Sequence, residues 1–138
     1  MANTIFAEKN KIAWVGIRPG VYGEQVLGYG TANNGTTIIY TVPAGKTLLL
    51  FDTFVQYYSG TSPGGTVTLR IRDAADAIVY NIYYVVVPLN GREGTACNSR
   101  WIPIEVPENY DIVLISSAAV AYASCHIEGI LIDPLVSL

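Results

Sequence analysis

A single histidine, His126, limits the chemistry that this chain of 138 residues could perform. A metal centre of the cupin type needs two or three histidines beside a glutamate, so one histidine cannot supply it. A hydrolase triad would need a serine on a nucleophile elbow, which is a turn from a strand into a helix, and no segment of the sequence has the sustained helical period that such an elbow requires. The alternation in residues 122–132 puts His126 on the same face as Glu128, pointing to solvent or to a subunit contact. We therefore predict no catalytic residue and no enzymatic activity.

The carboxylates and the glycine-rich segment show no ligand-binding pattern. Asp73 and Asp76 enclose only two alanines, and no further oxygen ligand follows at alternate positions, so a hairpin turn is favoured over a calcium site. Residues 62–65, Ser-Pro-Gly-Gly, lack the Lys-Ser/Thr pair and the helix that follow a phosphate-binding loop. We predict neither a bound metal nor any other cofactor.

The two cysteines, Cys97 and Cys125, form no Cys-x-x-Cys motif and no disulfide framework. In a reducing compartment, each is expected to be a small buried apolar side chain. The cysteines therefore predict a structural role.

The chain carries few charges for its size. Charged residues make up 14% of the sequence, against about 25% in an ordinary soluble domain, while 51% of residues are hydrophobic and ten are tyrosines. This composition is typical of a subunit that buries much of its surface against other subunits, because interface cores are poor in charge and rich in aromatic residues. A sandwich with a polar but uncharged surface, rich in Thr, Ser, Asn and Gly, is the alternative.

The charge balance argues against nucleic acid as a partner. The net charge is −3, and the eight Lys and Arg are scattered, whereas surfaces that bind phosphates are basic and clustered. The start, MANTIFAEKNK, has no basic segment followed by an apolar one, and the longest apolar stretch, residues 112–125, is too short to span a bilayer. We expect a protein made in the cytoplasm that binds neither nucleic acid nor membrane.

Residues 36–58 form the most regular stretch of the sequence. Two strand-like runs, 36–42 and 47–58, are joined by Pro43-Ala44-Gly45-Lys46. Proline ends strand pairing and glycine permits a turn. The second run is rich in β-branched and aromatic residues, and we expect it to be a long strand near the middle of a sheet.

The even positions of that run form a mostly apolar face of Leu48, Leu50, Phe54 and Tyr58. Asp52 and Gln56 are the polar exceptions on this face. If Asp52 is buried, it would need a partner such as Arg70, Arg72 or a backbone amide.

Other segments repeat this pattern of strand and turn. Strand-like runs are expected near residues 25–31, 66–73, 77–87, 99–106, 110–117 and 122–132, with a loop over 88–98. No segment has a sustained helical period, and short strands separated by turn signals are typical of a sandwich or barrel.

A short internal repeat favours one sandwich topology. Val42-Pro43 precedes an apolar run at the same spacing as Val106-Pro107 does, although chance could explain so short a match. Two halves that share a strand, a proline turn and a strand fit the paired Greek keys of a jelly roll. We predict an all-β, jelly-roll-like antiparallel β-sandwich of about eight strands with an extended N-terminal arm.

Residues 1–35 differ from the rest because their apolar residues follow no regular period. They form either an arm that lies on a sandwich or reaches another subunit, with Phe6 and Trp14 as anchors, or the first strand pair of the same sheet. Residues 36–138 form the β-sandwich domain.

The tyrosines are the strongest remaining indication of a contact surface. Tyr57 and Tyr58 are adjacent in one predicted strand, and Tyr83 and Tyr84 are adjacent in another. The two tyrosines of each pair must therefore point to opposite faces of the sheet. One tyrosine of each pair should face away from the core. Exposed tyrosines suit a subunit contact or a sugar-binding platform, and they are also ordinary strand residues.

Together, the motifs VPAGKTLLL, GTVTLRIRD, WIPIEVPENYDIVL and HIEGILID make the chain resemble the small jelly-roll structural proteins of tailed bacteriophages. These families repeatedly use a V-P-A-G-K entry to a long apolar strand and a late P-x-x-V-P turn. The present chain has Glu108-Asn109-Tyr110 in the late turn, where Ala-Gly is common.

The resemblance implies a virion component, commonly trimeric, and a capsid decoration (cement) role that stabilises the outside of the head. Its partners would be other copies of itself, as a homotrimer, and the major capsid protein. The expected assembly contacts are Phe6, Trp14, Tyr57 and Tyr84. The alternative is a tail or fibre component that binds a host-surface glycan through Tyr57 or Tyr84.

Overall fold

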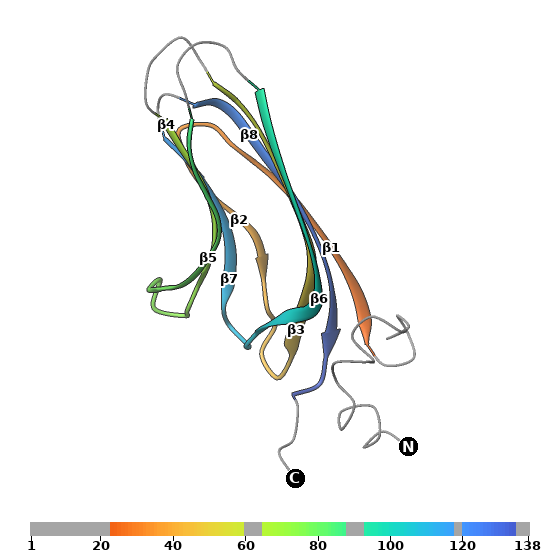
Figure 1. Cartoon of the computed structure of the whole chain (residues 1–138). Helices are drawn as coiled ribbons and strands as arrows, with labels where there is room; N and C mark the ends of the chain where they lie inside the picture. The colour runs from red at the N-terminus through yellow and green to blue at the C-terminus, as the bar shows by residue number, and fades with distance from the viewer. Residues whose placement is uncertain (1–22, 60–64, 88–92, 118–119, 135–138) are drawn as a thin grey trace.

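The structure is a computed structural model that describes residues 23–59, 65–87, 93–117 and 120–134. Within these residues the chain forms eight β-strands and no helix (Figure 1). The strands are β1 (Glu24–Ala32), β2 (Gly35–Thr41), β3 (Thr47–Ser59), β4 (Gly65–Arg72), β5 (Ile78–Val87), β6 (Glu93–Val106), β7 (Asp111–Ser116) and β8 (Val120–Ile132). The predicted all-β fold is therefore confirmed.

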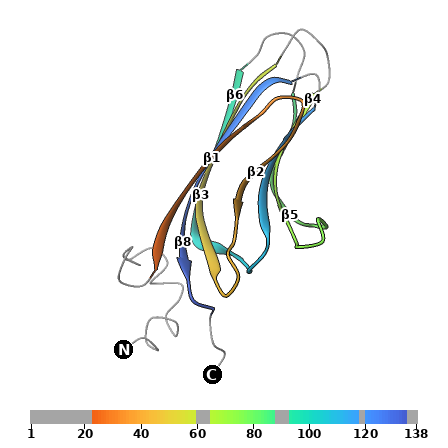
Figure 2. The ribbon, with the colours of Figure 1, turned by 180° about the vertical axis from the view of Figure 1, so that it is seen from behind.

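The strands form two four-stranded antiparallel sheets that face each other as a sandwich, seen in Figure 1 and from behind in Figure 2. The first sheet has the order β1-β8-β3-β6, and the second has the order β2-β7-β4-β5. The pairing is nested, because the first strand pairs with the last, the second with the seventh, the third with the sixth and the fourth with the fifth. Nested pairing of eight strands over two sheets is a jelly roll, as predicted.

The hydrophobic core lies between the two sheets. Alternate residues of β4, namely Val67, Leu69 and Ile71, are buried there, and the strand-like run predicted over residues 66–73 is confirmed. The other sheet contributes side chains such as Leu48 and Val55. Packing of these two inner faces joins the sheets into one domain.

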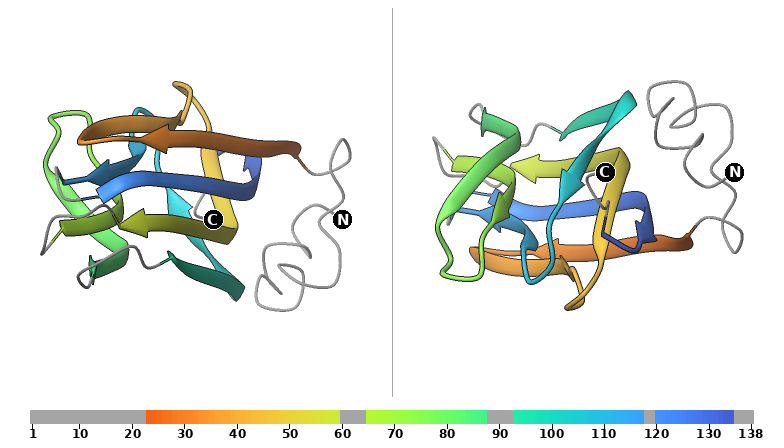
Figure 3. Two further views of the ribbon diagram at one scale, coloured as in Figure 1. Left: turned by 90° about the horizontal axis from the view of Figure 1, so that it is seen from above. Right: turned by 90° about the horizontal axis from the view of Figure 1, so that it is seen from below.

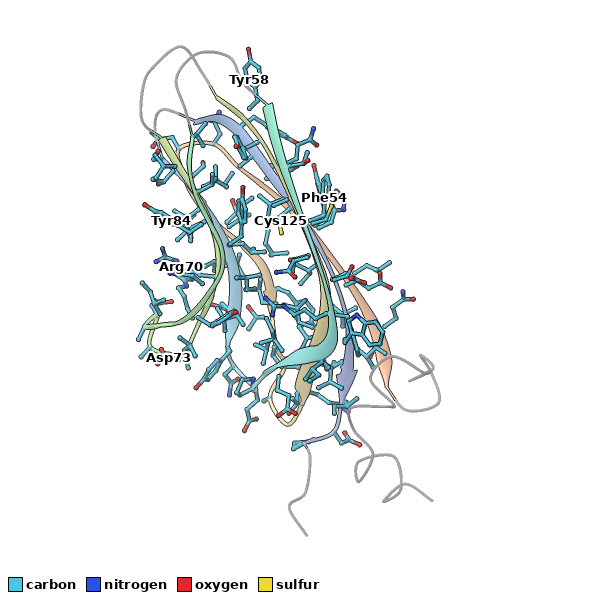
Figure 4. The ribbon with its side chains drawn as sticks, viewed as in Figure 1. Phe54, Tyr58, Arg70, Asp73, Tyr84 and Cys125 are labelled. Carbon is cyan, nitrogen blue, oxygen red and sulfur yellow. The ribbon has the colours of Figure 1, made fainter. Side chains whose placement is uncertain are left out.

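The predicted run 47–58 forms β3, which lies between β8 and β6 in the first sheet, as expected for a central strand. A bulge interrupts β3 between Leu50 and Asp52. A bulge adds one residue to one strand, so it reverses the face to which later side chains point. Leu50 is therefore buried in the core, whereas Phe54 lies on the outer face of the sheet (Figure 4). The predicted continuous apolar face at even positions is wrong beyond the bulge.

β6 begins at Glu93, inside the segment 88–98 that was predicted to be a loop. Residues 93–98 instead pair with the second half of β3. Glycine and asparagine in this segment disfavour strands, but the backbone hydrogen bonds of a neighbouring strand do not depend on side-chain type.

The register of β6 against β3 jumps between Ser99 and Ile104. Pro103 lies within the jump and has no amide hydrogen to donate to the ladder. Trp101 and Ile102, also within the jump, are 70% and 57% exposed. The irregularity thus directs two large apolar side chains away from the core.

Two turns that occupy equivalent places in the two halves of the sequence pack against each other. One begins with Val42-Pro43 and joins β2 to β3, and the other begins with Val106-Pro107 and joins β6 to β7. Gly45 and Asn109, at the same place in each turn, have positive φ angles of 74° and 63°. Val42 N donates a 3.0 Å hydrogen bond to Tyr110 O, and Asn109 N donates a 2.8 Å bond to Val42 O. The short sequence repeat therefore corresponds to a repeat in structure.

Substitutions at these equivalent positions are expected to have matching effects. Gly45→Ala and Asn109→Ala should each lower the free energy of unfolding by about 1 kcal/mol, because a side chain without a local hydrogen bond is strained at positive φ. Asn109→Gly should change it by less than about 0.5 kcal/mol. Urea unfolding followed by circular dichroism would measure all three. A Gly45→Ala variant as stable as the parent chain would contradict the equivalence.

The N-terminal strand β1 includes the predicted run 25–31 and pairs with β8 at one edge of the first sheet. Residues 24–32 therefore form a strand of the sandwich, which was one of the two alternatives for residues 1–35. The sandwich begins before residue 36. Phe6 and Trp14, the expected anchors of the arm, lie outside the described residues.

Candidate functional site

Adjacent tyrosines on β3 and β5 point to opposite sides of their sheets. Tyr57 and Tyr83 are half-buried and pack against the core, whereas Tyr58 and Tyr84 are exposed. Tyr84 points away from the outer face of the second sheet in Figure 4. Burial, together with the nearby Tyr57, raises the pKa of Tyr83. The prediction that one tyrosine of each pair faces away from the core is confirmed.

The ring of Tyr57 lies over Gly94, its partner on β6, where no larger residue would fit. Tyr58, not Tyr57, is therefore the outward member of the pair. Of the expected assembly contacts in the described part of the chain, Tyr84 is exposed and Tyr57 belongs to the core side.

One side of the sandwich is formed by β5 and β6, opposite the side formed by β1 and β2 (Figure 3). Large apolar side chains are exposed on it, and the guanidinium carbon of Arg100 lies 6.0 Å from the centre of the Tyr80 ring, so the two strands meet there. We call these five side chains the edge surface: Ile78, Val79 and Tyr80 are consecutive on β5 and Trp101 and Ile102 are consecutive on β6, so they point to both sides of their strands. Exposed aromatic and aliphatic side chains of this kind are common in interface cores.

β5 contains no charged residue and no proline. Among the residues described, it pairs only with β4, so its other edge has no strand partner there. Natural edge strands usually carry charges or proline that prevent pairing with another chain. Two register shifts disturb the first half of β5, but residues 83–87 pair regularly with β4. The second half of β5 thus presents a regular edge to which another copy of the chain could add.

A second candidate site is a shallow hollow of ≈ 460 Å³ on the outer face of the first sheet. Three rings cross it on neighbouring strands: Tyr29 on β1, His126 on β8 and Phe54 on β3. The ring centres of Tyr29 and His126 are 4.6 Å apart, and those of Phe54 and His126 are 6.2 Å apart. We call these three residues the aromatic row. A hydrogen bond to the Tyr122 hydroxyl, 3.4 Å away, raises the pKa of Tyr29.

Two carboxylates lie beside the aromatic row. Asp52 on β3 is directly opposite Glu128 on β8, and both line the hollow. Gln25 Nε2 donates a 3.0 Å hydrogen bond to Glu128 Oε1. His126 and Glu128 are exposed on the same face, as predicted. The lining of the hollow contains no lysine or arginine.

Asp52 lies on the outer face of its sheet and lines the hollow. It is therefore not buried in the core, and it needs no arginine partner there. Arg72 belongs to the second sheet, where its Nη2 lies 3.5 Å from Asp111 Oδ2 and 3.4 Å from Asp76 Oδ1. These ion pairs join β4, β7 and the turn after β4, and they have no part in the hollow.

Asp73 closes the turn between β4 and β5. Its Oδ1 accepts hydrogen bonds of 2.9 Å from the amides of Ala75 and Ala77, and Asp76 has a φ angle of 63°. The predicted hairpin turn is confirmed. Within the described ranges, no group of three or more His, Cys, Asp or Glu side chains could hold a metal ion. The same ranges contain no helix long and apolar enough to cross a membrane.

The two cysteines have different surroundings. Cys125 is buried between the sheets, as predicted, and burial raises the pKa of its thiol to about 12. Cys97 is exposed and lines the hollow, which corrects the prediction of a buried side chain. The cause is the register of β6, which places Cys97 opposite the outward-facing Phe54.

Iodoacetamide is expected to modify Cys97 on the order of 100-fold faster than Cys125 in the folded protein, because the thiolate is the reactive form and Cys125 is both buried and protonated. Mass spectrometry of the two cysteine-containing peptides over time would measure both rates. In urea the two rates should converge. Similar rates in the folded protein would contradict the burial of Cys125.

The sequence analysis did not identify Tyr29 and Phe54 as members of one site. They lie on different strands and meet only because β8 is inserted between β1 and β3. The nearest available signal was the alternation of β8, which correctly placed His126 and Glu128 on one outward face.

No protein-family model matches the chain, and no curated protein matches it significantly. Among solved structures, the chain is similar to one from Bacillus endospore appendages, described as a novel family of disulfide-linked pili. The similarity covers 80% of this chain and 87% of that chain, with 14% sequence identity and a TM-score of 0.40. This similarity is too low to indicate a shared function.

Proposed function

We propose that this chain is a non-enzymatic structural subunit of a tailed-bacteriophage virion, a decoration protein that binds the outside of the head and stabilises it. It forms a homotrimer and contacts the major capsid protein. The resemblance of its strand and turn motifs to small jelly-roll virion proteins supports the proposal. The structural observation that carries it is the apolar edge surface beside the uncharged strand β5.

The trimer contact would join unlike sides of neighbouring subunits. The edge surface and β5 of one subunit would pack on the β1 and β2 side of the next, where β2 carries no charge and Ile38 is exposed. A contact between unlike surfaces is heterologous, and it closes into a ring when the rotation between subunits permits. Each Å² of apolar surface covered contributes about 25 cal/mol before the costs of association are subtracted.

The action of such a subunit is mechanical. A trimer on the outside of the head bridges neighbouring capsid subunits and adds contact area between them. In this proposal no bond is made or broken.

Electron microscopy of the parent particle, labelled with an antibody to this chain, tests the location. We expect label over the head, and sedimentation of the purified full-length chain at micromolar concentration should give a trimer. Absence of the chain from the particle, or a clean monomer in solution, would overturn the proposal.

The second candidate function is that of a tail or fibre component that binds a host-surface glycan. The aromatic row and its neighbouring carboxylates favour this function, because sugar sites commonly combine aromatic rings with hydrogen-bonding side chains. Label confined to the tail would support this candidate over the decoration role.

A further inference from the structure

The outward side chains of the first sheet lie in parallel rows, because the strand registers align them. The aromatic row is in the middle. On one side of it lies a row of uncharged polar side chains, in which Thr31, Gln56 and Thr95 are exposed and Ser124 is buried. On the other side lies a row that holds both carboxylates: Leu27, Glu128, Asp52 and Ser99. The hollow is therefore lined by the aromatic row and by the row with the two carboxylates, and the neutral polar row lies next to it on the same sheet.

The aromatic row offers partly exposed ring surface. Tyr29 is 57% exposed, and Phe54 points outward from β3 (Figure 4). A pyranose ring has apolar C–H faces that pack on aromatic rings, and it also has hydroxyl groups around its rim. Rings at the centre and polar groups at the border match that distribution.

The two carboxylates can accept hydrogen bonds from a bound ligand, because both line the hollow. Like charges directly opposite each other on neighbouring strands are unfavourable. Gln25 donates to Glu128, but within the described residues Asp52 accepts no side-chain hydrogen bond. Sugar hydroxyls can donate to both carboxylates and would satisfy Asp52 on binding.

The charges of the hollow select against acidic sugars. Its lining has two carboxylates and neither lysine nor arginine, so a sialic acid or a sulfated sugar would be repelled. An organic cation would also be attracted to the carboxylates, and the test below includes one as a competing ligand. A neutral oligosaccharide can hydrogen-bond to the carboxylates and, where it extends past the aromatic row, to the exposed Thr31, Gln56 and Thr95.

We infer that the hollow lined by Tyr29, Phe54, His126, Asp52 and Glu128 is a binding site for a neutral oligosaccharide. The site goes beyond a purely structural role. It does not depend on whether the subunit lies on the head or the tail, because it occupies the outer face of the first sheet rather than the edge surface.

The test uses the full-length chain and begins with a microarray of neutral, sialylated and sulfated oligosaccharides. The neutral oligosaccharide with the strongest signal is then titrated into ¹⁵N-labelled protein while the imidazole resonances are recorded. His126 is the only histidine, so these resonances report on the hollow alone. We expect a saturable shift, and Tyr29→Ala and Asp52→Asn should each weaken binding about tenfold or more.

Tyr84→Ala is the matched control, because it removes an exposed tyrosine from the other sheet. It should leave saccharide affinity unchanged, and thermal unfolding should show that all three variants are folded. Failure of any neutral oligosaccharide to bind, or unchanged binding by folded Tyr29→Ala, would overturn the inference. So would shifts of the His126 signals with spermidine but with no neutral sugar. Sedimentation of the same samples reports separately on trimer formation, so failure of one proposal is distinguishable from failure of the other.

Discussion

Replacing Val79 and Ile102 together with lysine is expected to convert the proposed trimer into monomers. Both side chains are exposed in the isolated chain and belong to the edge surface. If that surface is covered by another subunit, each lysine would bring an unpaired charge into an apolar contact. An uncompensated buried charge costs about 3–5 kcal/mol, so the dissociation constant should rise on the order of 100-fold or more. Sedimentation velocity over a range of protein concentrations measures the change.

The control for this experiment is Tyr58→Lys, which adds the same charge to an exposed aromatic position on the central strand β3. It should leave the trimer intact. An unchanged sedimentation profile for the Val79→Lys, Ile102→Lys variant would show that the edge surface is not the contact. A conservative Val79→Ile variant should remain trimeric, which distinguishes a loss of apolar contact from a general sensitivity of β5.

Leu114→Ala is expected to cause the largest loss of stability among single substitutions. Leu114 lies on β7, between β2 and β4, and it is fully buried in the core. Truncation to alanine removes apolar contacts and leaves a cavity. Such substitutions lower the free energy of unfolding by about 2–5 kcal/mol, and we expect a loss of about 3 kcal/mol here. A fall in Tm on the order of 10 °C should follow. Thermal unfolding by circular dichroism, at one fixed protein concentration, measures it.

Leu27→Ala is the matched comparison, because the same atoms are removed from a side chain that is 71% exposed. Its effect should stay within about 0.5 kcal/mol. Equal losses for the two substitutions would contradict the assignment of Leu114 to the core.

Most of the strands could be predicted from the sequence because local signals specify them. In residues 66–73, strict alternation of Val67, Leu69 and Ile71 with polar residues required a strand with one buried face, and the structure has β4 there. Proline and glycine marked the turn before β3, and Asp73 marked the turn before β5. The shared Val-Pro turns also indicated two related halves.

The features that were missed depend on contacts between distant segments. Nothing near Phe51 in the sequence marks a bulge, yet the bulge between Leu50 and Asp52 decides which later residues of β3 are outward. Residues 93–98 have weak strand preference and form part of β6 because β3 offers a partner. The hollow has the same origin, since Tyr29 and Phe54 become neighbours of His126 only through the pairing of β1 and β3 with β8.

The nested pairing of the strands also has a consequence for how the chain folds. Gln25 on β1 and Glu128 on β8 are hydrogen-bonded across 103 residues of sequence, and β8 lies between β1 and β3. Contacts so distant in sequence carry a large loop-closure entropy, and folds dominated by them form in milliseconds to seconds rather than microseconds. The β4–β5 hairpin can close early, but β1 and β3 have no common neighbour until β8 has been synthesised. During translation the edges of β1 and β3 that pair with β8 therefore stay unpaired until β8 has been made, and this is the interval in which association with the wrong partner has to be avoided.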